Sequence, residues 1–111
     1  MFSPRKELIL YERGVGKFPF KEWLEGLQDK KARYVIRARL DRLRYYGHAG
    51  NCKRIGKGVL ELKIYYGPGY RVYFGEERKN IILLLCGGDK NTQKKDIQRA
   101  QSYLADYRGG R

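Results

Sequence analysis

Residues 60–74 decide the fold, and they read Leu60-Glu61-Leu62-Lys63-Ile64-Tyr65-Tyr66-Gly67-Pro68-Gly69-Tyr70-Arg71-Val72-Tyr73-Phe74. Apolar and polar side chains alternate on both sides of a Gly-Pro-Gly turn, which predicts two antiparallel strands joined as a hairpin. The even-numbered residues then pack against a core. The odd-numbered residues share the opposite, ligand-accessible face, and they are Glu61, Lys63, Tyr65, Arg71 and Tyr73.

The segments before the hairpin carry one strand pattern and two helix patterns. Residues 7–12 read as an opening strand, and Pro19 suits the first turn of a helix. Asp29 is a suitable cap for a second helix, which Gly47 and Gly50 end. Because only a few residues separate the two helices, we expect them to form a hairpin. A short strand is expected over 53–56 and a longer one over 59–66.

The segments after the hairpin predict one buried strand and one helix. Residues 80–86 are apolar at almost every position, which is typical of a strand covered on both faces, and Gly87 and Gly88 are expected to stop it. Asn91 or Thr92 is expected to cap the last helix. The element order indicates the α+β class: a mostly antiparallel sheet of four or five strands, with an N-terminal helical hairpin and a C-terminal helix.

At 111 residues, the chain has the length of a single domain over residues 1–111, and we expect residues 108–111 to form a frayed tail. The formal net charge is +13, and residues 30–57 hold ten basic side chains against one acid, Asp41. Such a field calls for an acidic partner, either nucleic acid or protein. The segments lack the length and pattern of membrane binding, so no membrane contact is expected.

The N-terminal residues lack a signal-peptide pattern, which predicts a cytoplasmic protein with Cys52 and Cys86 reduced. The single histidine, His48, cannot supply a cysteine or serine catalytic arrangement by itself. Neither cysteine has the neighbouring ligands of a metal site, and no acidic cluster suits magnesium. The sequence therefore predicts neither a metal nor a cofactor.

Lysine, arginine and tyrosine suffice for cleavage of RNA, because the 2′-hydroxyl is a nucleophile within the substrate. Arg71 would brace the phosphate, and Lys63 would take or give a proton, with Glu61 as a competing base. Tyr65 and Tyr73 would stack on a base. The alternatives are structural: Glu61 pairs with Lys63 and Arg71 across the strands, and both tyrosines are ordinary strand formers. The basic helix face is equally compatible with a solvated surface.

Several motifs together resemble the RelE/ParE toxin superfamily, and most closely its phage-derived, HigB-type addiction module killer proteins. The similarity covers approximately Leu8 to Tyr107. The motifs are Pro19-Phe20-x-x-Trp23-Leu24, Arg39-Leu40-x-Arg42-Leu43, Lys53-Arg54-Ile55-Gly56-x-Gly58-Val59-x-Glu61-Leu62-Lys63-Ile64, Gly67 to Phe74, and Leu84-Leu85-x-Gly87-Gly88-x-Lys90-x-x-Gln93-x-x-Asp96-Ile97.

The resemblance implies a RelE-like, microbial RNase-like fold and the toxin half of a type II toxin–antitoxin pair. Such toxins are typically metal-free, ribosome-dependent mRNA endonucleases. They are neutralised by an antitoxin that often has a helix-turn-helix domain, so operator DNA is contacted only through the antitoxin. Carried over by motif, the catalytic positions are Arg71, Lys63 and Lys90. The start of the family's terminal helix falls at Gln93 and Lys94. Several RNA-cleaving members place a tyrosine or histidine near this helix as acid or base, whereas this chain offers Lys94 and Lys95, with Tyr103 later, which leaves the general acid unassigned.

The sequence thus favours a ribosome-dependent endoribonuclease. Candidate RNA contacts are Lys53, Arg54, Lys57, Tyr65, Tyr73, Gln93, Lys94, Arg37 and Arg44, the last two on the arginine-rich helix expected to grip ribosomal RNA. The superfamily also contains toxins that poison DNA gyrase without cutting RNA, and this is the alternative function. A third possibility is a passive RNA-binding module. For either toxin, the excess of positive charge predicts an acidic antitoxin.

Overall fold

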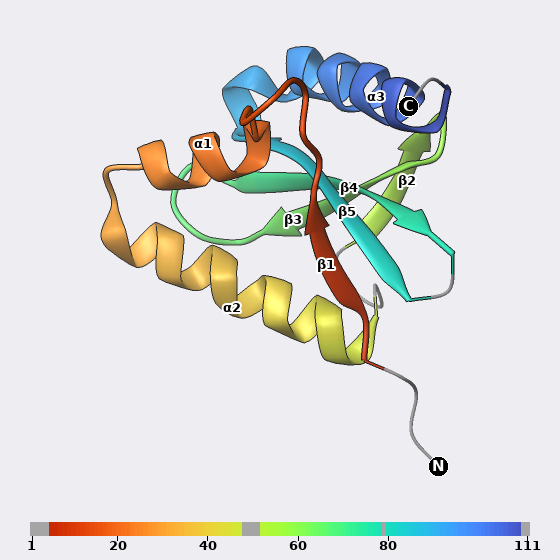
Figure 1. The fold of residues 1–111 in the computed structure, drawn as a ribbon. Coiled ribbons are helices and arrows are strands. Elements are labelled where there is room, and N and C mark those ends of the chain that lie inside the picture. The colour runs from red at the N-terminus through yellow and green to blue at the C-terminus, as the bar shows by residue number, and fades with distance from the viewer. Residues whose placement is uncertain (1–4, 48–51, 79, 110–111) are drawn as a thin grey trace.

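A five-stranded sheet with the strand order β1-β5-β4-β3-β2 forms the centre of the molecule (Figure 1). The structure is a computed structural model, and it describes residues 5–47, 52–78 and 80–109. The strands are β1 (Glu7–Leu10), β2 (Cys52–Gly56), β3 (Val59–Ile64), β4 (Tyr70–Glu77) and β5 (Ile81–Gly88). Neighbouring strands from β2 to β5 pair antiparallel, whereas β1 pairs parallel with β5. The predicted, mostly antiparallel sheet is confirmed.

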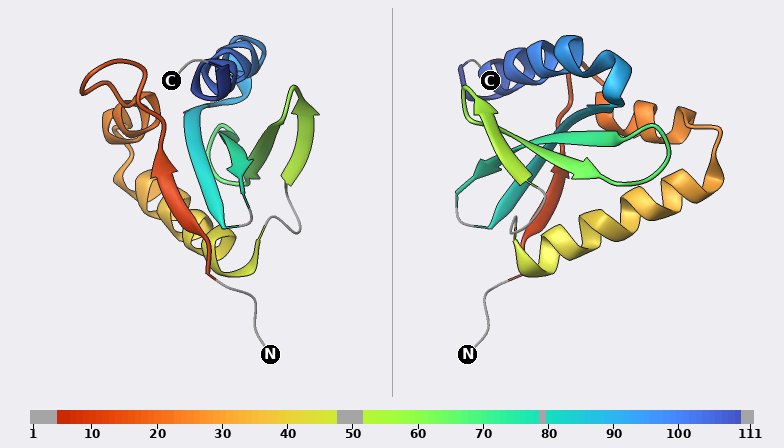
Figure 2. Two further views of the ribbon diagram at one scale, coloured as in Figure 1. Left: turned by 45° about the vertical axis from the view of Figure 1, so that its right-hand side comes forward. Right: turned by 180° about the vertical axis from the view of Figure 1, so that it is seen from behind.

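The helices lie on both faces of this sheet, as the views in Figures 1 and 2 show. They are α1 (Pro19–Gly26), α2 (Lys30–Tyr46) and α3 (Gln93–Gly109), with a short 3-10 turn, η1 (Lys90–Thr92), before α3. The α+β class, the N-terminal helical hairpin and the C-terminal helix are therefore confirmed, and the arrangement is compatible with a RelE-like fold. None of these helices, within the residues described, is long and apolar enough to cross a bilayer.

The even-numbered and odd-numbered residues of the β3–β4 hairpin lie on opposite faces of the sheet, as the alternation predicted. Leu62 pairs with Val72, and both belong to a core under α1 and α2. A second cluster lies under α3 and includes Tyr73, on the opposite face. Gly67 and Gly69 both have positive φ angles, 58° and 82°, in the turn between the strands. Glycine adopts this conformation without the steric cost that a Cβ imposes.

The helix starts follow local capping signals, with one difference from the sequence prediction. Pro19 lies in the first turn of α1, and the Asp29 side chain accepts a hydrogen bond from the Ala32 amide at 3.1 Å, as predicted. At the C-terminal helix, however, the capping residue is Asp89, which caps the preceding 3-10 turn η1, since its side chain accepts a hydrogen bond from the Asn91 amide at 2.8 Å. The cap therefore precedes Asn91 and Thr92, and η1 comes before α3.

The C-terminal helix continues through Gly109, beyond the point where fraying was expected to begin. Arg108 is anchored by hydrogen bonds to the Glu77 carboxylate, the shortest at 2.9 Å. This contact explains why the last turn stays helical. Gly110 and Arg111 of the expected tail lie outside the described residues, as do His48 and Gly50.

Strand β5 ends at Gly88, but Gly87 and Gly88 are its last two residues rather than a break after it, and they pair with Val72 and Arg71. Their role is to allow close approach. A Cβ at Gly87 would lie 2.3 Å from the Trp23 ring, and a Cβ at Gly88 would lie 1.7 Å from Asp96 Oδ2. The two glycines therefore let α1 and the start of α3 pack directly against opposite faces of the strand.

Candidate functional site

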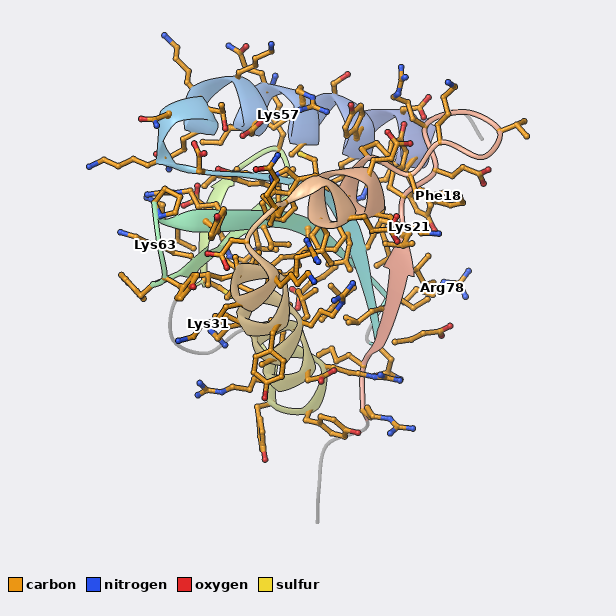
Figure 3. All side chains as sticks on the ribbon, turned by 90° about the vertical axis from the view of Figure 1, so that its left-hand side faces the viewer. Phe18, Lys21, Lys31, Lys57, Lys63 and Arg78 are labelled. Carbon is orange, nitrogen blue, oxygen red and sulfur yellow. The ribbon has the colours of Figure 1, made fainter. Side chains whose placement is uncertain are left out.

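A pocket of about 340 Å³ opens on the α3 face of the sheet, at the end of β3 and the beginning of β4. Residues from β2, β3, β4 and the start of α3 line it, and they are Cys52, Lys53, Glu61, Lys63, Tyr65, Arg71 and Gln93. Helix α3 covers the rest of this sheet face, so the pocket occupies the part that its first turn leaves uncovered. Figure 3 shows Lys63 at this open end.

The two predicted central cations are neighbours on adjacent strands. Lys63 pairs with Arg71 in the register of β3 and β4, and both side chains line the pocket. Lys63 is partly exposed, and its Nζ lies 4.9 Å from the centre of the Tyr65 ring. The Tyr65 side chain is 71% exposed. A cation over an aromatic face is a favourable contact, and this exposed ring remains accessible to a base.

Arg71 is far more buried than the alternation indicated, with only 7% of the residue exposed. Its Nη1 donates a hydrogen bond to the Gly69 carbonyl at 2.7 Å, and its Nε lies 3.8 Å from Glu61 Oε2. That Nε has no hydrogen-bond partner among the described residues. The guanidinium is therefore held in place near a counter-charge, while one of its donors is unsatisfied.

Glu61 joins three parts of the site. The carboxylate is 2% exposed, and its Oε2 accepts hydrogen bonds from the Tyr73 hydroxyl and from Gln93 Nε2, both at 2.9 Å. Burial raises the pKa of Tyr73, and the hydrogen bond to Glu61 raises it further. The Tyr73 phenol therefore stays protonated and acts as a hydrogen-bond donor to the carboxylate.

Two expectations about this face are wrong, for one physical reason. Tyr73 is fully buried under α3, so its ring cannot stack on a base. Glu61 and most of Arg71 are also covered rather than displayed. The alternation of a strand determines which face a side chain lies on, but it does not reveal which part of that face a distant helix covers.

The start of α3 is held by a polar cluster that the sequence reasoning missed. Asp96 is 3% exposed and lies over Gly88, and its Oδ2 accepts a hydrogen bond from Thr92 Oγ1 at 2.5 Å. Gln93 precedes it and contacts Glu61 across 32 sequence positions. A conspicuous Gly-Gly pair before the helix was the available signal for the close approach, but nothing indicated that Gln93 and Glu61 would meet.

The other predicted site residues do not line this pocket. Lys90 and Lys94 are exposed just beyond it, on η1 and the first turn of α3. Arg54 pairs with Leu60 and so lies on the α2 face, and Lys57 belongs to the β2–β3 turn, which lies beside Gln101 and Arg108 of α3 (Figure 3). The α2 residues Arg37 and Arg44 are also on the opposite side of the sheet.

The described parts of the chain contain no group of three or more histidine, cysteine or acidic side chains placed to hold a metal ion. Cys52 and Cys86 are both free thiols. Burial raises the pKa of Cys52 to about 11 and that of Cys86 to about 12. The Cys52 thiol, although it lines the pocket, is therefore a poor nucleophile at neutral pH.

Comparison with known proteins identifies the family. The family model described as Phage derived protein Gp49-like (DUF891) matches residues 22–106. The chain belongs to the Gp49-like family. This is a family of RelE/HigB-like toxins, which confirms the resemblance seen in the sequence motifs. An uncharacterized protein of Haemophilus influenzae is 44% identical over 82 residues, which span 74% of this chain and 82% of that protein. A toxin of this family implies an antitoxin partner.

Proposed function

We propose that this Gp49-like toxin cleaves mRNA on the ribosome and so inhibits translation. The observation that supports the proposal best is the cross-strand pair of Lys63 and Arg71, which line one pocket together with Tyr65. Two cations and an accessible aromatic ring match the phosphate and the base of one nucleotide. The pocket is open to solvent on the side where Lys63 lies.

The chemistry we propose uses the 2′-hydroxyl of the substrate as the nucleophile. Arg71 would stabilise the negative charge that develops at phosphorus, and its fixed position would avoid reorganisation during the reaction. Lys63 would contact the phosphate or transfer a proton. Glu61 is a weaker candidate for the base, because it is 2% exposed and already accepts two hydrogen bonds. Lys53 and Lys90 would add positive charge around the pocket.

A second surface would hold the ribosome. Helix α2 has seven basic residues against one acid, and its outer side carries exposed tyrosines. Tyr34 and Tyr46 are 72% and 80% exposed, and Arg37 is also exposed. Cations interleaved with accessible rings suit ribosomal RNA, whose phosphates and unpaired bases offer both types of contact. Since α2 lies on the opposite side of the sheet, this surface would not compete with mRNA for the pocket.

We also propose an acidic antitoxin, in keeping with the net charge of +13, with a helix-turn-helix domain that contacts operator DNA. The activity belongs in the cytoplasm, where ribosomes and transcripts meet. A gyrase poison is the second candidate function. This second function is favoured by the burial of Arg71, because a guanidinium that donates to the Gly69 carbonyl and lies near Glu61 also suits a purely structural role.

The test compares Lys63→Ala with Lys21→Ala, which removes an exposed lysine from α1, labelled on the opposite side of Figure 3 from Lys63. Each variant is added to a translation reaction, and primer extension locates new ends in the mRNA. The parent and Lys21→Ala should cut only when ribosomes are present, and Lys63→Ala should cut at least about 100-fold more slowly. Intact transcripts with the parent would refute the proposal, and broken chromosomes in cells expressing it would favour gyrase.

A further inference from the structure

The position of the Glu61 carboxylate raises a question about the neighbouring arginine. A buried guanidinium and a buried carboxylate normally close to a hydrogen-bonded ion pair, because each loses hydration on burial. Here Arg71 Nε and Glu61 Oε2 are 3.8 Å apart, which is beyond hydrogen-bonding distance. Both side chains are more than nine-tenths buried, and the Arg71 Nε has no hydrogen-bond partner in the described residues.

Two other donors account for this separation. The Tyr73 hydroxyl and Gln93 Nε2 both bind the same oxygen, Oε2, at 2.9 Å. Tyr73 belongs to β4 and Gln93 to α3, so the carboxylate is fixed from the sheet and from the helix at once. An oxygen already bound to two donors has little capacity for a third. The tethers therefore occupy the Glu61 oxygen that faces the Arg71 Nε, and they do so without using that donor.

We propose that Tyr73 and Gln93 hold Glu61 back from Arg71 and thereby keep the pocket-lining guanidinium of Arg71 available for an oxyanion of an RNA phosphate. This inference rests on the proposed function only for the identity of the ligand. The pocket is lined by Arg71, Lys63 and Lys53, so an incoming phosphate meets two further cations. Glu61 keeps the buried guanidinium oriented, and the tethers prevent Glu61 from occupying the phosphate position itself.

The proposal predicts that Tyr73 and Gln93 affect RNA binding through their hydrogen bonds to Glu61. Tyr73→Phe or Gln93→Ala would let Glu61 close on Arg71, and RNA would then have to compete with the carboxylate. Glu61→Gln keeps an oxygen that accepts both hydrogen bonds but removes the competing charge. We therefore expect weaker RNA binding in the first two variants and equal or tighter binding in Glu61→Gln.

The experiment measures the affinity of each variant for a short 2′-O-methyl RNA, which binds but cannot be cleaved. Tyr73→Phe and Gln93→Ala should bind about 10-fold more weakly than the parent, the range expected when one charge-assisted hydrogen bond is lost. Gln98→Ala, an exposed glutamine on the same helix, is the control and should bind like the parent. Urea unfolding of each variant checks that it is folded under the conditions of the binding measurement.

A double variant separates this mechanism from general structural damage. If Tyr73→Phe acts by releasing Glu61, it should have no effect once Glu61→Gln is present, and the double variant should bind like Glu61→Gln alone. An equal loss in both backgrounds would overturn the proposal, as would parent-like binding of folded Tyr73→Phe and Gln93→Ala. A parent that binds this RNA through Lys63 without cutting mRNA on ribosomes would refute the proposed function and leave this inference standing.

Discussion

Replacing Gly88 by alanine tests how closely α3 packs against the sheet. The added methyl group would lie 1.7 Å from Asp96 Oδ2 and 2.7 Å from Thr92 Oγ1, so the helix start must move. Overpacking costs about 1–3 kcal/mol, and disruption of the partly buried hydrogen bond between Thr92 and Asp96 adds about 1 kcal/mol. A total of about 3 kcal/mol is a large part of the roughly 5–15 kcal/mol that stabilises a domain.

Urea unfolding followed by circular dichroism measures this loss. With an m-value of about 1.5 kcal/mol per M, a loss of about 3 kcal/mol lowers the midpoint by about 2 M. Gly26→Ala is the matched control, because it adds the same methyl group at the end of α1, where nothing lies within 4 Å. It should leave the midpoint unchanged or raise it, since alanine favours helices by up to about 1 kcal/mol over glycine. Equal midpoints for Gly88→Ala and the parent would refute the close-packing argument.

Three further predictions concern the cap, the core and the thiols. Asp29→Ala removes the cap of α2 and should lower Tm by about 5 °C, whereas Asp29→Asn should keep most of the stability; equal Tm values would exclude a capping role. Leu104→Ala creates a cavity under α3 and should cost about 2–5 kcal/mol in urea unfolding, against less than about 1.5 kcal/mol for Leu104→Met. Both thiols should react slowly with iodoacetamide at about pH 8.5 and rapidly after unfolding, because burial raises the pKa of Cys52 to about 11 and that of Cys86 to about 12. The thiols of the unfolded chain ionise at a lower pH than those of the folded protein, so the free energy of unfolding should fall as pH rises above about 9. A free energy of unfolding that stays constant between about pH 8 and 11 would contradict the raised pKa values.

Local patterns in the sequence predicted most of the secondary structure. The alternation around Gly67 to Gly69 gave the hairpin and the shared face of Lys63 and Arg71, because side-chain direction in a strand depends only on parity. Capping by Asp29 was equally local. The parallel pairing of β1 with β5 was not predicted, because the partner of a strand depends on packing between segments far apart in the chain.

The sequence predicted which charged residues share the candidate site, but it did not predict which of the site residues helix α3 buries. Lys63, Arg71 and Lys53 do line one pocket. Tyr73, however, lies beneath α3 and donates its hydroxyl hydrogen bond to Glu61 rather than contacting a ligand. The contact between Gln93 and Glu61 depends on how α3 packs against the sheet, and the hydrophobic periodicity of the sequence does not contain that information. Gly88 was interpreted as a strand end because glycine disfavours strands, and β5 does end there, but the sequence did not reveal that the missing side chain makes room for Asp96.

The parallel pairing of β1 with β5 affects when the protein can fold during its synthesis. A nascent chain emerges from its N-terminus, so Glu7–Leu10 leaves the ribosome long before Ile81–Gly88 exists to pair with it. Gln93, which ties Glu61 to the last helix, is translated later still. Residues 7–93 must therefore all be translated before the pocket can assemble, and a product released before Gln93 lacks the residue that ties Glu61 to the last helix.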